Sequence, residues 1–327
     1  MILVTGGAGF IGSVLVGELN NRGITDILIV DRLSDSSKWK NIRNLKYSEY
    51  VHADELFLPE YADLLEKVSF IFHIGACSST TEMDMDYLMK NNVLYSKNLF
   101  ELARDLKVPF IYASSAATYG DGELGYDDDH EKVSGFKPLN PYGYSKQLFD
   151  EWVLAHEDRP SHWFGLKYFN VFGPNEYHKD DMSSLVFKAY HQILETGKVR
   201  LFKSHKEGFE DGKQLRDFVY VRDIVNAMVE MMDSKHASSS GIYNMGTGTA
   251  NSFYDLAVHT FKAMGKEQNI EFFDMPERLR KQYQYFTEAN MTKFNSLLPE
   301  FTFNPLDKAV HDYVTNYLMK EDPHYNA

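Results

Sequence analysis

Cysteine, long apolar runs and positive charge are all scarce in this chain of 327 residues. The single cysteine, Cys77, excludes an internal disulfide framework and fits a reducing compartment, so we expect a cytoplasmic protein. No stretch approaches the ~20 apolar residues of a membrane-spanning helix, so we expect no membrane partner. The formal net charge of −13 disfavours nucleic acid, which requires a basic surface. Because the first apolar run begins at Met1, we expect no signal or transit peptide.

Four glycines fall within the short segment Thr5–Gly12, and their spacing indicates a ligand-binding turn. This segment follows an apolar run typical of a buried parallel strand and leads into residues with helical apolar spacing. Gly6, Gly9 and Gly12 then permit a tight turn, close approach of the backbone to a pyrophosphate, and close packing of helix on strand. The helix N-terminus offers free amides to the phosphates. The segment therefore predicts a dinucleotide-binding site.

Apolar runs alternate with helical patterns along the chain, which is typical of an α/β fold with a doubly wound parallel sheet. We therefore predict a Rossmann-like domain. The predicted strands are Ile2–Thr5, Ile27–Asp31, Phe70–Ile74, Phe110–Ser114, Phe164–Phe169, Phe218–Val221 and Ile242–Met245. Helices are predicted over Asp86–Leu106 and Pro141–His156. The acidic segment Asp127–Glu131 is predicted to be a solvated surface loop.

Beyond Asn170 the pattern loosens into loops rich in charge and aromatic residues. We expect a smaller, discontinuous α/β domain that binds substrate, with the cleft at the carboxyl ends of the strands. The predicted cofactor-binding domain comprises residues 1–169, 220–246 and 284–307. The predicted substrate-binding domain comprises residues 170–219, 247–283 and 308–327.

The end of the second predicted strand bears on the choice of cofactor. Asp31 follows the glycine turn by about 20 residues, where a carboxylate binds the adenosine ribose and favours NAD. Arg32 and Lys38 could instead hold the 2′-phosphate of NADP, or could be ordinary surface charges. These residues leave NAD and NADP as equal alternatives.

A second constellation predicts acid–base chemistry. Tyr142 and Lys146 are four positions apart on one face of a predicted helix, so the ammonium lies near the phenol and the cofactor ribose. A nearby ammonium and a cationic nicotinamide should lower the pKa of the phenol from ~10. Ser115, at a predicted strand end, could hydrogen-bond a carbonyl formed on oxidation. A Tyr-x-x-x-Lys pair alone is common by chance; the glycine turn and the serine make it specific.

Together these motifs resemble the extended short-chain dehydrogenase/reductase family along essentially the whole chain. Within it, the segments His73–Glu82, Ala113–Gly120, Tyr168–Pro174 with His178-Lys179, Arg216–Val221 and Tyr283–Thr287 are similar to the ADP-L-glycero-D-manno-heptose 6-epimerases. That resemblance implies inversion at C6 of ADP-D-glycero-D-manno-heptose through a 6-keto intermediate, for the lipopolysaccharide inner core. It also implies bound NADP and a homo-oligomer.

The resemblance assigns roles residue by residue. It implies Tyr142 and Lys179 as the two bases, supported by Lys146 and Ser115. The implied cofactor-binding residues are Gly6, Gly9, Phe10, Ile11, Gly12, Asp31, Arg32, Lys38, Ile74, Gly75, Ala76, Cys77, Ser78, Asn91, Lys146, Val171 and Lys179. The implied substrate-binding residues are Asn170, Asp181, Lys188, Phe202, Lys203, Ser204, His205, Arg216 and Tyr283. No metal is implied, and Cys77 is expected to pack beside the dinucleotide without a catalytic role.

The chain departs from the resembled family at several of these positions. Asp181 and Lys188 stand where the family has a serine and a histidine that contact substrate, and Ala53 replaces a lysine that contacts cofactor. Residues 202–205 differ from the family, and the segment to Leu215 is longer. These differences bear on substrate affinity and loop geometry, not on the class of reaction.

Other functions remain as alternatives. A dehydratase is disfavoured because Ala116-Ala117-Thr118 lacks the acidic pair those enzymes carry. A UDP-hexose 4-epimerase is a closer alternative, although a second base at Lys179 argues against it. A non-catalytic NADP-sensing protein would not need Tyr142 and Lys146. A simple alcohol dehydrogenase would accumulate reduced cofactor.

Overall fold

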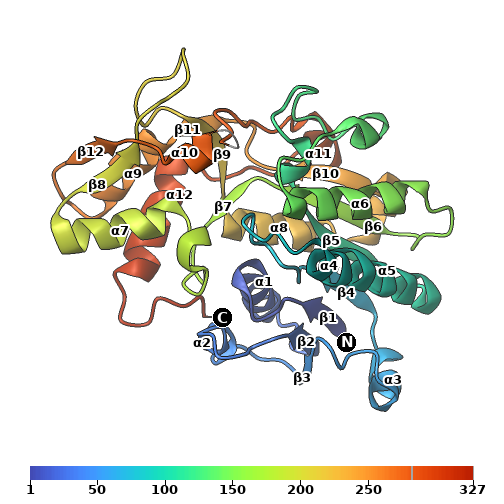
Figure 1. The fold of residues 1–327 in the computed structure, drawn as a ribbon. Helices are drawn as coiled ribbons and strands as arrows, with labels where there is room; N and C mark the ends of the chain where they lie inside the picture. Colours follow the sequence, from blue (N-terminus) through green and yellow to red (C-terminus); the bar gives the residue numbers. More distant parts are fainter. Residues whose placement is uncertain (281–282, 327) are drawn as a thin grey trace.

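The computed structural model describes residues 1–280 and 283–326, and its centre is a seven-stranded sheet (Figure 1). Every neighbouring pair of strands is parallel. The strand order is β3-β2-β1-β4-β5-β6-β10, so the predicted α/β, Rossmann-like fold is confirmed. The strands are β1 (Ile2–Thr5), β2 (Ile27–Asp31), β3 (Glu49–His52), β4 (Phe70–His73), β5 (Phe110–Ser115), β6 (Trp163–Tyr168) and β10 (Gly241–Met245).

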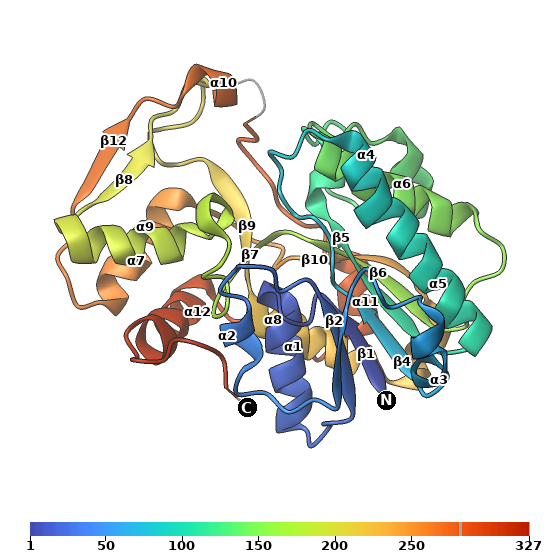
Figure 2. The same ribbon diagram turned by 60° about the horizontal axis from the view of Figure 1, so that its bottom comes forward.

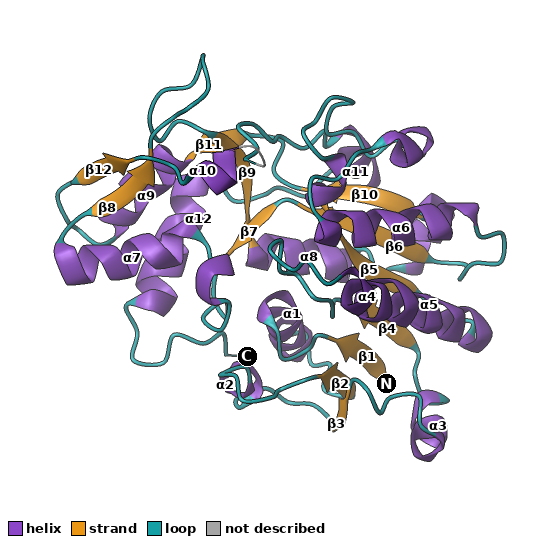
Figure 3. Cartoon of the chain, viewed as in Figure 1, coloured by secondary structure: helices purple, strands orange, loops and turns teal. Residues whose placement is uncertain are grey.

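Helices cover both faces of this sheet, which explains why most of its strands are apolar throughout. One face packs against α1 (Phe10–Asn21) and α8 (Val221–Glu230), and the other against α5 (Tyr95–Leu106) and α6 (Pro141–Ala155). Figure 3 shows these helical layers around the sheet. The shorter helices of this part are α2 (Trp39–Ile42), η1 (Pro59–Tyr61), α3 (Ala62–Leu65), α4 (Met85–Leu88), η3 (Ala116–Tyr119), η4 (His130–Gly135), η6 (Ser234–Ser239) and α11 (Thr292–Leu297).

Several segments of the chain after β6 build a smaller part beside the sheet (Figure 2). It contains a three-stranded sheet in the order β11-β9-β7 and a parallel pair of β12 with β8. Its strands are β7 (Asn170–Phe172), β8 (Val199–Phe202), β9 (Leu215–Tyr220), β11 (Ala250–Ser252) and β12 (Ile270–Phe273). Its helices are η5 (Asp180–Met182), α7 (Leu185–Thr196), α9 (Phe253–Ala263), α10 (Glu277–Arg280), α12 (Leu306–Tyr313) and η7 (Val314–Leu318).

One predicted strand lies outside the large sheet, and one strand of that sheet was not predicted. The strand predicted at Phe218–Val221 is β9, which pairs with β7 and β11 in the small sheet. The edge strand β3 was missed. Its sequence, Glu-Tyr-Val-His, lacks an apolar run because only Val51 is fully buried in it. An edge strand covered on one side needs less apolar sequence than a central one.

The two predicted helices form, with one irregularity. Helix α6 begins at Pro141, after Asn140 accepts a hydrogen bond from the Gly143 amide at 2.8 Å. The segment predicted at Asp86–Leu106 is α4 and α5 joined by a π-helical stretch, Met89–Leu94. Such π-helical turns are frequent at functional sites, and this one carries Asn91 and Asn92.

The prediction that Asp127–Glu131 is solvated was wrong in part. The Asp128 carboxylate is only 2% exposed and accepts a hydrogen bond from the Asn244 amide at 2.7 Å. His130 Nε2 accepts from the Ile242 amide at 2.9 Å. These residues give polar partners to β10, the edge strand of the large sheet, which a run of charged residues in a sequence does not reveal.

Within the described residues, no helix combines the length and the apolar character needed to cross a membrane.

Candidate functional site

A cavity of about 640 Å³ opens at the carboxyl ends of β1, β2, β4, β5 and β6. Helix α9 and the segment after η5 close it from the smaller part through Phe253, Leu256 and Leu185. The lining contains each predicted catalytic residue and each predicted cofactor-binding residue, together with Asn170. This position, beside the central strand β1 where the chain crosses from β3 to β4, is the usual ligand site of such sheets.

The glycine turn after β1 leaves room only for backbone. Gly6 has φ of +65°, and a Cβ there would lie 2.7 Å from Gly75. A Cβ on Gly12 would lie 2.1 Å from the Gly6 carbonyl oxygen, and one on Gly9 would lie 3.1 Å from it. The turn therefore presents bare amides at the start of α1, where no side chain of the helix caps them. These residues fit a dinucleotide pyrophosphate.

The carboxylate at the end of β2 is held by the protein itself. Asp31 is 6% exposed, and its oxygens accept from the amides of Ala8 at 2.9 Å and Arg32 at 2.7 Å. The Lys38 ammonium also pairs with Asp31. Arg32 points instead to Asp54, with its guanidinium 2.5 Å from the carboxylate. Two cations thus stand at the place where the adenosine ribose of a dinucleotide would lie.

The loop after β4 carries Cys77 and Ser78 along one wall of the cavity. The Asn92 side chain clamps it, donating to the Cys77 carbonyl at 2.9 Å and accepting from the Cys77 amide at 2.8 Å. Asn92 also donates to the Ser145 hydroxyl at 3.0 Å, which ties this loop to α6. Asn92 was missed from the sequence, where it stands directly beside the predicted residue Asn91.

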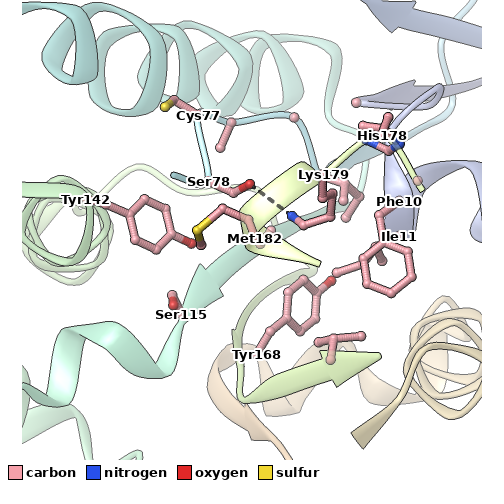
Figure 4. Close-up of a pocket in the computed structure, with 18 of the residues that line it drawn as sticks. Phe10, Ile11, Cys77, Ser78, Ser115, Tyr142, Tyr168, His178, Lys179 and Met182 are labelled. Atoms are coloured by element: carbon pink, nitrogen blue, oxygen red, sulfur yellow. Dashed lines mark hydrogen bonds between the residues drawn. The ribbon is translucent and has the colours of Figure 1, made fainter. Parts of the chain in front are cut away.

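Tyr142 and Ser115 lie on the same side of the cavity (Figure 4). Burial raises the pKa of Tyr142, while a hydrogen bond to the Ser115 hydroxyl acts in the opposite direction. Lys146 is not among the groups that lower the pKa of Tyr142 in the protein alone. Its ammonium donates to the Ala113 carbonyl at 2.9 Å. Burial lowers the pKa of Lys146 to about 8.

Lys179 approaches the cavity from the opposite side, out of the loop between β7 and η5. Figure 4 shows its ammonium directed toward Ser78, to whose hydroxyl it donates at 3.3 Å. The same ammonium lies 6.0 Å from the Phe10 ring centre. Burial lowers the pKa of Lys179, and its neighbour His178 has a pKa lowered to about 4 for the same reason.

Most of the residues predicted to bind substrate lie outside this cavity. Arg216, only 6% exposed, sits with its guanidinium carbon 5.2 Å from the Tyr283 ring centre, and Tyr283 packs edge-on against Phe202. Lys188 donates to the backbone carbonyl of Asp181 at 2.6 Å. Not found in the cavity lining are Asp181, Lys188, Phe202, Lys203, Ser204, His205, Arg216 and Tyr283.

Several lining residues carry no motif that sequence reasoning could detect. They are apolar or aromatic residues that come from distant parts of the chain: Tyr87, Tyr95, Met182, Leu185, Phe253 and Leu256. Only the fold brings them together.

Comparison with known proteins places these features in one family. Residues 2–246 match the model of the NAD dependent epimerase/dehydratase family. The chain belongs to this family. It is 50% identical to the ADP-L-glycero-D-manno-heptose-6-epimerase of Fusobacterium nucleatum subsp. nucleatum, and the match covers 98% of this chain and 99% of that protein. The predicted family resemblance is confirmed, and the protein is a nucleotide-sugar epimerase.

Solved structures of related proteins also resemble this chain over almost its full length. The Helicobacter pylori ADP-L-glycero-D-manno-heptose-6-epimerase superimposes with a TM-score of 0.80 at 32% identity, covering 96% of this chain and 95% of that one. MoeE5, determined in complex with UDP-glucose and NAD, gives a TM-score of 0.75 at 26% identity and covers 96% and 97% of the two chains. The family is therefore one of nicotinamide-dependent enzymes. Membership of this family does not distinguish NAD from NADP as the cofactor.

The glycine turn after β1, the glycine cradle, predicts that two substitutions weaken cofactor binding to different extents. Gly12→Ala should weaken dinucleotide binding at least 10-fold, because its methyl group would collide with the Gly6 carbonyl and displace the turn. Gly9→Ala, whose methyl group meets the same carbonyl at 3.1 Å, is the matched control and should weaken binding less. Titration of each variant with reduced cofactor, followed by fluorescence, measures both. Equal binding by all three proteins would contradict the assignment of the cradle.

Proposed function

We propose that this protein inverts C6 of ADP-D-glycero-D-manno-heptose to give ADP-L-glycero-D-manno-heptose. The observation that carries the proposal is the placement of two proton-transferring groups, Tyr142 and Lys179, on opposite sides of one cavity. The full-length identity to epimerases of that name supports the choice of substrate. The product would supply the inner core of lipopolysaccharide.

Inversion at C6 requires hydride to leave one face of C6 and to return to the other face, while the proton of the C6 hydroxyl is removed and then replaced. A bound nicotinamide cofactor supplies reversible hydride transfer. One base accepts the proton of the C6 hydroxyl as the C6 hydrogen departs as hydride, which leaves a 6-keto sugar. The ketone then presents its other face, takes the hydride back, and receives a proton from the second residue. Because the hydroxyl points in opposite directions in the two epimers, a single base is poorly placed for both.

We assign Tyr142 and Lys179 these two roles. Lys146 holds positive charge beside the phenol and the cofactor ribose, which favours the phenolate, and Ser115 donates its hydroxyl to the oxygen at C6. Each positioned acid or base contributes a factor of ~10²–10⁴. The lowered pKa of Lys179 helps it to release its proton near neutral pH. Cys77 lines the cavity as a small packed side chain.

We propose NADP as the cofactor, held at its 2′-phosphate by Arg32 and Lys38. A guanidinium suits a phosphate because it donates in a planar fork, and Lys38 adds a second positive charge. The pyrophosphate would lie on the amides after Gly6 and Gly9. NAD would forgo the charge contacts and bind more weakly.

We place the nucleotide of the substrate against the smaller part. Arg216 offers a guanidinium to its phosphates, Tyr283 and Phe202 offer aromatic faces, and residues 203–205 border them. Asn170 meets the sugar, and Asp181 and Lys188, which lie outside the cavity lining, flank its residues 182–185 in the sequence. Beyond its nucleotide-sugar substrate, we expect the protein to associate with copies of itself and to act in the cytoplasm, without nucleic acid or membrane as partner.

The proposal is tested first by incubating the protein with ADP-D-glycero-D-manno-heptose and NADP and following C6 by proton NMR. We expect conversion to the L-glycero epimer with no net accumulation of reduced cofactor. An alcohol dehydrogenase would accumulate it, and a UDP-hexose 4-epimerase would leave the heptose unchanged while converting UDP-hexoses. An NADP-sensing protein would convert neither sugar.

Single-turnover measurements with each epimer distinguish the roles of the two proposed bases. Tyr142→Phe and Lys179→Met should each lower kcat by ~10²–10⁴-fold. Each variant should still reduce bound cofactor with one epimer and fail with the other, because one base remains for one face of the sugar. Lys137→Met, at an exposed lysine, is the control for loss of a positive charge. Full activity of Lys179→Met would refute the second base.

The pKa of Lys146 sets a pH limit on activity. Its ammonium is present below a pKa of about 8 and is lost as the pH rises through that value. We therefore expect kcat/KM to fall above about pH 8. Lys146→Arg keeps its charge at any such pH, so the residual activity of this variant should not fall there. Identical upper limits for the two proteins would assign the titration to another group.

The pairing of Arg32 with Asp54 generates a prediction on cofactor choice. A 2′-phosphate must compete with Asp54 for Arg32, so Asp54→Asn should raise the affinity for NADP relative to NAD. Arg32→Ala should lower it about 10-fold, as expected for loss of a charge-assisted hydrogen bond. Arg104→Ala removes an arginine paired with Asp105 and is the control. The test is to measure the dissociation constants of NADP and NAD for each variant at one salt concentration. An unchanged ratio in Arg32→Ala would contradict the role of Arg32.

A further inference from the structure

A fully buried ion pair lies beneath the site and takes no part in the chemistry above. The Lys167 ammonium, on β6, is 2.6 Å from the Asp150 carboxylate, on α6, and both side chains are 0% exposed. Burying two charges is unfavourable unless each is fully hydrogen-bonded, and apolar replacements are often equally stable. A buried pair is therefore weak evidence of a role in stability, and its other contacts indicate what it does.

Both members have further partners on the elements that carry the site. Asp150 accepts hydrogen bonds from the Tyr112 hydroxyl at 3.0 Å and the Ser114 hydroxyl at 2.7 Å, both on β5. Lys167 donates to the Thr118 hydroxyl at 2.7 Å. Its ammonium also lies over the ring of Tyr119, 5.2 Å from the centre. The pair thus joins α6, β5, β6 and η3.

The Thr118 hydroxyl carries the connection on to Ser115. It donates to the Ser115 carbonyl at 2.8 Å, and the Ser115 hydroxyl accepts from the Ala117 amide at 3.1 Å. Ser115 is the residue at which β5 ends and η3 begins, so its conformation depends on how that turn is held. Thr118 itself is 0% exposed.

The other end of the connection is the helix that carries the proposed phenol. Asp150 follows Lys146 by four residues and Tyr142 by eight, so all three lie along one face of α6. The charge of Asp150 also favours the ammonium form of Lys146, whose other neighbours are Cys77 and the Ala113 carbonyl.

We propose that Asp150, Lys167 and Thr118 are positioning residues that hold Ser115 at a fixed distance from Tyr142. This rests on the proposed function, in which Ser115 and Tyr142 act on the same oxygen of the substrate. The Asp150–Lys167 pair does so by joining the turn after β5 to α6 on the side away from the cavity. Its side chains are fully buried, so water does not compete for their hydrogen bonds. A displacement of about 1 Å between reacting groups is enough to lower a rate about 100-fold.

Thr118 offers the sharpest test, because one atom can be changed while the ion pair remains. Thr118→Val keeps the shape of the side chain and removes the hydroxyl that links Lys167 to Ser115. We expect kcat to fall about 10- to 100-fold with KM changed less than about threefold, since the loss affects alignment and not binding. Thr118→Ser keeps the hydroxyl and should restore kcat to within about threefold of the wild type.

A control separates positioning from loss of stability. Asp223→Asn perturbs another buried carboxylate, on α8, which accepts from the Asn304 amide at 2.8 Å and lies outside the cavity lining. It should lower the melting temperature and leave kcat unchanged. If Thr118→Val also leaves kcat unchanged, or if Thr118→Ser loses as much as Thr118→Val, the positioning role is refuted.

Hydrogen–deuterium exchange of residues 114–120 tests the same inference without any activity. Exchange at the Ala117 amide should be faster in Thr118→Val than in the wild type and in Thr118→Ser. Equal exchange in all three proteins would refute the inference. Should the wild type leave the heptose unchanged, the proposed function fails, and this measurement still decides whether Thr118 holds the turn.

Discussion

The site depends on the close approach of two turns, those that follow β1 and β4. Parallel pairing of these strands brings both turns to one edge of the sheet, and there the backbones of Gly6 and Gly75 touch with no space for a side chain. Because the floor of the cavity is bare backbone, amides at the start of α1 face the cavity directly. A side chain at either glycine would force the two turns apart.

Below that floor, buried polar side chains fix the groups that face the cavity. The His73 ring bridges the Thr5 and Ser96 hydroxyls, at 2.7 Å on each side, and burial lowers its pKa to about 3, so it bridges as a neutral ring. Thr5 in turn accepts from the Gly75 amide at 3.1 Å. With the Asn92 clamp and the Asp150–Lys167 pair, this network ties four strand ends and two helices together. Catalytic groups need such support because small displacements are costly.

The loop that carries Lys179 is held from the other side, by the C-terminal segment. Asn175, fully buried, donates to the Ser13 hydroxyl of α1 and accepts from the Tyr325 amide, each at 2.8 Å. The Tyr177 hydroxyl donates to the Pro323 carbonyl at 2.6 Å. The last described residues thus fasten this loop to the helix whose N-terminus faces the cavity. The two proposed bases are therefore positioned by separate networks, one around α6 and one around α1.

Features that depend on neighbours along the chain could be predicted from the amino-acid sequence. The glycine turn, the spacing of Tyr142 and Lys146, and the apolar runs of the central strands are local patterns, so the fold class and these parts of the cavity lining could be predicted. The resemblance to a known family added lining residues such as Asn91 and Lys179. The tertiary structure alone decided which partners each charge has: Arg32 with Asp54, Asp128 with β10, Asp150 with Lys167. It also assigned β9 to the small sheet and left Arg216 and Tyr283 outside the cavity. Such pairings are set by packing between segments far apart in sequence, which local propensity and periodicity do not encode.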